Sequence, residues 1–297
     1  MTTADRLPRR LLGTVAALAL LAAPAAAQAP SAAPGATPAA GPAPGVTADA
    51  LSAGIARMAA HRAAYRLDIG EARGSGISAV RGAMVFDVAD ACEGWATRQR
   101  MTMTVVDRDG QEIETISDYA TYEAKDGSRL RFSLSQTTNG AVSQRVAGEA
   151  ELGADGAGRV RFSDPVGREE PLPAGTLLPM RHTALSVEAA RAGRRILVAP
   201  LFDGTSDEGA QDTTTVVSSW GPASGEPRFP LLAGQASGRM RIAFFERGAA
   251  TGGASQPDYE VGLRYFENGV ADELVMDFGE FSVTGRMLEL TPLPGGC

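Results

Sequence analysis

The sequence predicts an all-β domain, built as one long antiparallel meander of strands with a single helix inside it. Apolar residues alternate with polar ones in many short runs, which is typical of strands with one buried and one wet face. Asn-Gly and Asp-Gly pairs separate these runs, and such pairs are strong hairpin signals. Because no internal linker interrupts the roughly 250 residues before Cys297, we expect one large domain.

Residues 1–27 have the pattern of a secretory signal peptide. Arg6, Arg9 and Arg10 precede an apolar run that begins at Leu11, and small residues lead to an expected cut after Ala27. The apolar run is too short to span a bilayer well, and no later stretch reaches about 20 consecutive apolar residues. We therefore expect an exported protein that does not span the membrane.

Residues 28–49 are almost entirely alanine, proline, glycine and serine, and we interpret them as a flexible linker. Residues 50–297 then form the expected β domain, with a short helix possible from about Ala48 to Ala60. Cleavage at Ala27 would change the formal net charge from −7 to −9, because three arginines and one aspartate are removed. This charge argues against a nucleic-acid partner.

The predicted strands follow from His61 onward. The clearest is "SRLRFSLSQ", in which Leu130, Phe132 and Leu134 share one face. The same alternation occurs at Tyr65, Leu67 and Ile69; at Met240, Ile242 and Phe244; at Val261, Leu263 and Tyr265; and at Leu274, Met276 and Phe278. The turns are expected at "DRDGQE", "AKDGS", "TTNGA", "GADGAG" and "FENGV".

One segment departs from this pattern. It predicts a helix from about Met180 to Ala192, with Gly193 as its C-cap and Arg191 near the negative end of its dipole. A single helix in a β chain must bury its apolar side, and packing on the inner face of a strongly curved sheet is the simplest arrangement.

The chain has two cysteines, Cys92 and Cys297. In an exported chain they are more commonly paired than free, although a redox-active or intermolecular thiol remains open. A bridge between them would close a loop of about 200 residues and stabilise the fold by roughly 5 kcal/mol at most.

Few residues suggest catalysis or a cofactor. His61 and His182 are the only histidines, neither has a metal-binding or triad pattern around it, and we expect both to make structural hydrogen bonds. The stretch "GSGISA" at 74–79 has dinucleotide-like glycine spacing, but a strand follows it, so we interpret it as a glycine-rich turn or bulge. We expect no catalytic residue, no cofactor and no metal.

Two further patterns are weighed against plainer explanations. Acidic loops that could suggest calcium lack the alternating ligand positions of a calcium loop and are expected to be solvated turns: they contain Asp107, Asp109, Asp203, Asp207, Glu208 and Asp212. An aromatic set could line a lipid pocket, although alternating aromatic residues in strands usually form core: it comprises Trp95, Phe132, Trp220, Phe244 and Phe278.

Three stretches resemble the cell envelope integrity EipB family of exported proteins. They are residues 61–101, which include "ACEGW", residues 172–214, and residues from Tyr259 to the terminal cysteine. The resemblance spans nearly the entire expected domain in the same order. The linker at 28–49 is longer than the family core needs.

The resemblance implies a periplasmic protein with a single large curled antiparallel sheet, a β-spiral, on which one internal helix packs. It also implies a disulfide between Cys92 and Cys297 and a non-enzymatic role in maintaining envelope integrity. We expect that role to involve binding a periplasmic or envelope protein. The alternative is a carrier that holds an acyl chain or lipoprotein lipid in the concave face of the sheet.

Overall fold

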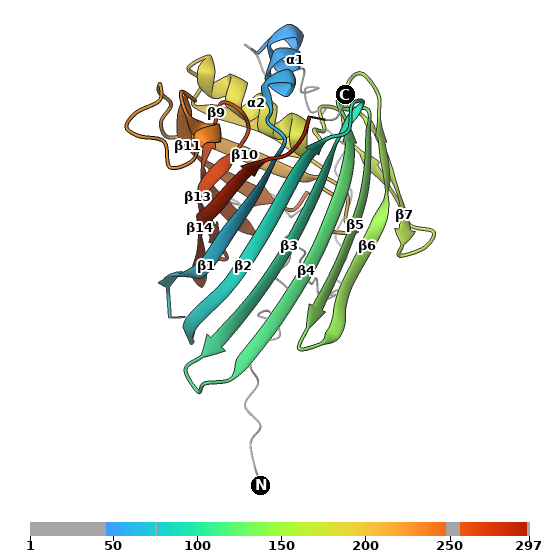
Figure 1. Cartoon of the computed structure of the whole chain (residues 1–297). Coiled ribbons are helices and arrows are strands. Elements are labelled where there is room, and N and C mark those ends of the chain that lie inside the picture. Colours follow the sequence, from blue (N-terminus) through green and yellow to red (C-terminus); the bar gives the residue numbers. More distant parts are fainter. Residues whose placement is uncertain (1–45, 75, 248–255, 296–297) are drawn as a thin grey trace.

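The computed structural model describes residues 46–74, 76–247 and 256–295, and within them 14 strands form one antiparallel sheet (Figure 1). The strands are β1 (His61–Ala72), β2 (Ile77–Asp90), β3 (Gly94–Asp107), β4 (Glu112–Ala124), β5 (Arg129–Thr138), β6 (Ala141–Leu152), β7 (Gly158–Asp164), β8 (Glu169–Leu172), β9 (Ile196–Leu201), β10 (Gln211–Val217), β11 (Ser237–Phe245), β12 (Tyr259–Phe266), β13 (Ala271–Asp277) and β14 (Phe281–Pro292). The helices are α1 (Ala48–Arg57), α2 (Pro179–Arg191) and the short 3₁₀ turn η2 (Pro230–Leu232).

The sheet is a meander in two halves, as the sequence predicts. Strands β1 to β8 pair in sequence order, and so do β9 to β14, while the pairing of β1 with β14 joins the halves. In that pairing His61 lies opposite Pro292. Strands β8 and β9 are the two ends of the sheet order, so the sheet curls without closing, and α2 connects these two end strands. The predicted curled antiparallel sheet is confirmed.

The strand and turn predictions hold for the clearest segments, whereas Phe278, which the alternation predicts to continue the strand of Leu274 and Met276, lies just beyond the end of β13 at Asp277. Leu130, Phe132 and Leu134 are all buried on one face of β5. Each of the five predicted turns contains one glycine with positive φ, as turn glycines commonly do: Gly110, Gly127, Gly140, Gly156 and Gly269. In "TTNGA" the asparagine also has a positive φ of 50°, which is the backbone of a tight two-residue hairpin. Of the glycine-rich 74–79 stretch, Gly74 and Gly76 have positive φ between β1 and β2, and residues 77–79 already belong to β2, with a register irregularity there, as expected of a turn or bulge.

The two helices lie together at one end of the sheet (Figure 1). Their apolar residues pack with the inner-face side chains Val88, Trp95 and Leu197. α2 ends in a Schellman motif. Arg194 donates its backbone N–H to the carbonyl of Ala189, and Gly193 donates its backbone N–H to the carbonyl of Ala190. The helix predicted on the inner face of the curved sheet is thereby confirmed, with bounds shifted by one residue.

α1 begins where the sequence predicts but ends at Arg57, three residues before the predicted limit at Ala60. Met58 is extended, with φ −62° and ψ 135°, and its side chain is buried beneath the helices. The chain leaves the helix early because β1 has to start at His61. The signal peptide predicted at 1–27 and most of the linker predicted at 28–49 lie outside the described residues.

Neither helix in the described residues has the length and apolar character needed to cross a bilayer. The same residues contain no group of three or more His, Cys, Asp or Glu side chains arranged to hold a metal ion.

Candidate functional site

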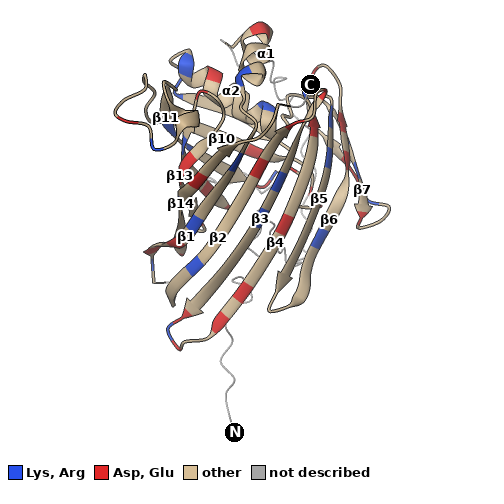
Figure 2. Ribbon diagram, viewed as in Figure 1, with Lys and Arg blue, Asp and Glu red and all other residues tan. Residues whose placement is uncertain are grey.

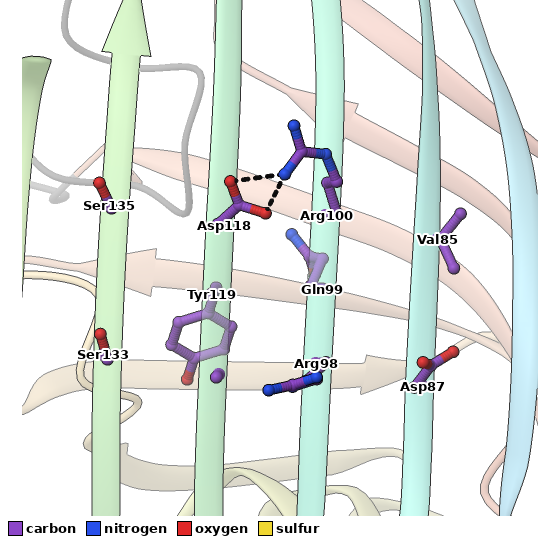
Figure 3. Close-up of a pocket in the computed structure, with 10 residues that line it drawn as sticks. Val85, Asp87, Arg98, Gln99, Arg100, Asp118, Tyr119, Ser133 and Ser135 are labelled. Carbon is purple, nitrogen blue, oxygen red and sulfur yellow. Dashed lines mark hydrogen bonds and ion pairs between the residues drawn. The ribbon is translucent and has the colours of Figure 1, made fainter.

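The outer face of strands β2 to β5 carries a groove of about 400 Å³ (Figure 3). Basic and acidic residues are interspersed over this side of the sheet (Figure 2). The groove is lined by Val85, Asp87, Arg98, Gln99, Arg100, Asp118, Tyr119, Ala120, Ser133 and Ser135. Its volume falls within the range of roughly 300–1,000 Å³ that small-molecule sites occupy in proteins.

Strand register arranges most of this lining in two rows across the sheet. One row contains Asp87, Arg98, Ala120 and Ser133; the other contains Val85, Arg100, Asp118 and Ser135. In the first row the long side chain of Arg98 on β3 lies next to the short side chains of Ala120 on β4 and Ser133 on β5. The groove exists because β4 and β5 contribute only small side chains at this level of the sheet.

The charges in the groove are unevenly paired. Asp118 accepts hydrogen bonds from Nη1 of Arg100 at 2.7 and 2.9 Å. Asp87 accepts two from Arg62 at 2.7 and 2.6 Å, and this contact lowers the pKa of the Asp87 carboxyl. Among the described residues Arg98 forms no ion pair, and Figure 3 shows its guanidinium pointing from β3 toward β4. The groove therefore presents one cation without a bound carboxylate.

A second, smaller space, the interior cavity, lies on the inner side of the sheet beneath the first turn of α2 and is partly open to solvent. It has a volume of about 130 Å³. Its walls are Met58, Ala59, His61, Phe86, Val88, Thr97, Tyr119, Pro179, Met180, Thr183, Tyr265, Asn268, Gly269 and Ala271. An engineered cavity of about 150 Å³ holds a benzene molecule, so this interior cavity admits a single ring and not an acyl chain.

The aromatic residues that could have lined a lipid pocket do not come together. Trp95 packs with the helices, Phe132 packs in a cluster formed mainly by β5 to β7, and Phe244 belongs to the largest cluster. Trp220 and Phe278 pack against that largest cluster from its edge. None of the five lines the interior cavity, so the ordinary explanation as core residues is right.

Both histidines are buried, as expected of structural residues. Nδ1 of His61 lies 2.7 Å from the carbonyl oxygen of Ala59, and burial lowers the pKa of the ring. His182 lies on α2 with Nε2 3.5 Å from Oγ1 of Thr213, and burial lowers its pKa to about 4. Both rings are therefore neutral near pH 7, and neither is joined to a carboxylate by a described hydrogen bond.

Glu123 is a buried charged site that the sequence did not single out. Its carboxylate lies on the inner face of β4, 2% exposed, and accepts the backbone N–H groups of Met180 and Arg181. Burial raises its pKa to about 7, against the opposing effect of those two hydrogen bonds. The sequence did hold a signal for such a residue: the N-cap Leu178 has no side chain that can accept the free N–H groups of the helix, so a distant acceptor was needed.

The acidic loops act as turn formers, but the solvated-turn interpretation is right only for the loop with Asp107 and Asp109; it is wrong for Asp203, whose loop is packed into the protein and whose carboxyl pKa is raised by burial. Oδ1 of Asp107 accepts the N–H groups of Asp109 and Gln111 at 2.8 Å. Asp203 similarly holds its own loop through Thr205. Asp207 pairs with Arg168, Asp212 pairs with Arg247, and the carboxyl of Glu208 is partly buried with a raised pKa.

Cys92 lies in the exposed turn between β2 and β3, with a positive φ of 66°. Its backbone N–H is donated to Oδ1 of Asp90 at 2.9 Å. Cys297 lies outside the described residues, so its pairing with Cys92 stays a prediction.

Comparison with known proteins gives one consistent result. Residues 52–294 match the family model described as EipB-like. The chain is 32% identical over 248 residues to the cell envelope integrity protein EipB of Brucella abortus strain 2308, covering 81% of this chain and 86% of that protein. It also resembles a crystal structure from Brucella abortus, described as a β-barrel-like protein of the domain of unknown function DUF1849. The TM-score is 0.71 at 28% identity, over 80% of this chain and 99% of the other.

Proposed function

The chain belongs to the EipB-like family, and we propose that it maintains the integrity of the cell envelope by binding another envelope component, without catalysing a reaction. The envelope role follows its Brucella relative, which is named for that role. The binding activity is our own inference from the outer groove.

The observation that carries the binding proposal is that Arg98, in that groove, has no ion-pair partner among the described residues, although its charge still acts on Asp87. Arg98 borders a space of about 400 Å³, and the carboxylate beside it, Asp87, is already engaged by Arg62. A guanidinium without a bound carboxylate can form bidentate hydrogen bonds to a polar or acidic group of a partner. The strands beneath the groove are long and paired on both sides, so the site is preorganised.

A non-catalytic role is supported by the state of the two histidines. A general base has to reach a substrate proton and to titrate near the working pH. His182 is buried with a pKa of about 4 and lines neither space, burial lowers the pKa of His61, and neither ring forms a described hydrogen bond to a carboxylate that would orient it as a base.

The carrier alternative has less support. The concave side of the sheet is filled by three hydrophobic clusters, and the interior cavity beneath α2 measures about 130 Å³. An acyl chain would need α2 to move away from Val88, Trp95 and Leu197, which would expose buried apolar surface.

We further propose that the protein is exported to the periplasm after cleavage at Ala27, with residues 28–49 as a linker and 50–297 as one β-spiral domain. An oxidising compartment would let Cys92 and Cys297 pair. The register supports this geometry, because Pro292 lies opposite His61, and His61 lies opposite Val88 near the end of β2. The N–H of Leu293 is also donated to Ala60, which holds the chain at that edge near the turn with Cys92.

The test is complementation of a deletion strain challenged with detergent and a cell-wall antibiotic. The intact gene should restore growth, whereas Arg98→Gln and the groove-filling Ala120→Tyr should restore it poorly. Arg81→Gln is the matched control, since Arg81 is an exposed β2 arginine paired with Glu112 outside the groove.

If the deletion strain tolerates both challenges, the envelope role does not apply to this chain. If Arg98→Gln and Ala120→Tyr both complement fully at normal protein levels, the role stands but the groove is not its binding site. Immunoblots of the periplasmic fraction would establish those protein levels and the cleavage at Ala27 together.

A further inference from the structure

The interior cavity beneath α2 has the features of a binding site of its own. It lies between the segment that joins α1 to β1, the first turn of α2, the β12–β13 hairpin and the inner face of β2 to β4. Parts of the chain more than 200 residues apart therefore meet around it. Its volume of about 130 Å³ is close to that of a cavity known to hold one benzene ring.

The lining of the cavity selects a neutral occupant. None of its 14 residues is an aspartate, glutamate, lysine or arginine. His61 is the only lining residue that could carry a charge near neutral pH, and its burial lowers the pKa of the ring. An ionised ligand would lose part of its hydration without meeting an opposite charge, which is costly in a mostly apolar pocket.

His61 offers that occupant one hydrogen-bond acceptor. The carbonyl oxygen of Ala59 can only accept a hydrogen bond, so the neutral ring carries its proton on Nδ1, 2.7 Å from that oxygen. Nε2 is therefore left with a lone pair. Within the described part of the chain no residue donates to Nε2, and this atom stays accessible although His61 as a whole is only 3% exposed. An accessible acceptor at the wall of a mostly apolar pocket favours a ligand that brings a donor to it.

On the other side of the cavity, the hydroxyl of Tyr265 also has a lone pair free to accept a hydrogen bond. Oγ1 of Thr183 donates to the carbonyl of Pro179 at 3.1 Å, so the hydroxyl of Tyr265, 3.3 Å away, is the donor to Thr183. The Tyr265 oxygen keeps a lone pair for a further contact. Both polar ends of the cavity thus accept hydrogen bonds, while Phe86, Val88 and Met180 supply apolar walls.

We propose that this cavity binds a neutral, single-ring group that carries one O–H or N–H donor, and that the donor bonds to Nε2 of His61. A phenol is the simplest molecule of this description. The group can belong to a free small molecule or to a tyrosine side chain of a partner. The inference goes beyond the envelope role and does not involve the outer groove.

The test measures binding of phenol, benzene and benzoate to the full exported protein by NMR, following the amides of Thr183, Tyr265 and Ala271. Phenol should bind about fivefold more tightly than benzene, the ratio that corresponds to one net hydrogen bond of about 1 kcal/mol. Benzoate should not bind at the same concentrations.

Two variants decide the role of the site. His61→Phe keeps a ring of similar size and removes the acceptor, so phenol and benzene should bind equally. Ala271→Leu fills the cavity and should abolish binding of both. His182→Phe is the matched control, because His182 is also buried but does not line the cavity, and it should keep the fivefold preference.

Equal affinity for phenol and benzene in the wild-type protein would overturn the proposal, and so would an unchanged preference in His61→Phe. If Ala271→Leu does not fold, the comparison in His61→Phe still decides. N-acetyl-tyrosinamide separates the two sources: binding as tight as phenol supports a partner's side chain, and binding of phenol alone supports a free small molecule. Failure of every probe would overturn the cavity proposal and leave the complementation result for the envelope role unaffected.

Discussion

The carboxylate of Glu123, on β4, caps the first turn of α2 by accepting the backbone N–H of Met180 at 2.7 Å. Its second oxygen accepts the N–H of Arg181 at 2.9 Å. Helix N-termini leave several N–H groups without partners, and here the residues before α2 supply no capping side chain. A residue 57 positions away in the sequence therefore fastens the helix to the sheet.

Loss of this cap should destabilise the protein. Glu123→Leu leaves two buried N–H groups without an acceptor, and we expect it to lower the free energy of unfolding by about 1–3 kcal/mol at pH 5. Glu123→Gln, which keeps one carbonyl acceptor, should lose less. Urea denaturation measures both, with Glu112→Leu as a control on the exposed end of the same strand. A similar loss in the control would show that the cap is not responsible.

The raised pKa of Glu123 predicts that its contribution to stability falls as the pH rises. Its pKa is about 7 in the folded protein against 4.5 when unfolded, so the folded state binds the proton more tightly. Between pH 4.5 and 7 the wild type should therefore lose about 3 kcal/mol relative to Glu123→Gln. Urea denaturation of both proteins across that range measures the difference. A constant difference would mean that the carboxyl titrates normally.

His182 predicts a change of opposite sign. Its pKa is about 4 in the folded protein against 6.5 when unfolded, so the unfolded state binds the proton more tightly. The stability of the wild type relative to His182→Gln should rise by about 3 kcal/mol between pH 4 and 6.5. The same denaturation series would reveal it, and a flat difference would show that His182 is hydrated in the folded protein.

The proposed disulfide predicts a melting temperature that depends on reductant. Reduction should lower the Tm of the wild type, because a bridge between Cys92 and Cys297 restricts the unfolded chain. Cys297→Ser should melt at the lower temperature with or without reductant. Differential scanning calorimetry with thiol counting measures both. An unchanged Tm after complete reduction would show that no stabilising bridge joins these residues.

Much of the fold could be predicted because its signals are local. The alternation of Leu130, Phe132 and Leu134 sets which face of β5 is buried, and the glycines at 110 and 140 occupy turn positions that demand positive φ. The family stretches likewise cover a continuous sequence. These features depend on neighbours within a few residues, so they can be read from the chain before it folds.

The candidate sites could not be predicted in the same way, because each depends on register and curvature. Arg98 lines a groove only because β4 and β5 place the small residues Ala120 and Ser133 beside it. It lacks an ion pair because Arg62 already binds Asp87. The interior cavity arises where α2 fails to fill the space next to His61.

The sequence by itself therefore determined the strand periodicity, the turns, the helix and the family, all of which follow from short-range backbone preferences and side-chain alternation. Only the tertiary structure decided that β1 pairs with β14, that Glu123 caps α2, and that a groove and a small neutral cavity lie on opposite faces of the sheet. Those contacts join distant residues, and the curl of the sheet decides which of them meet.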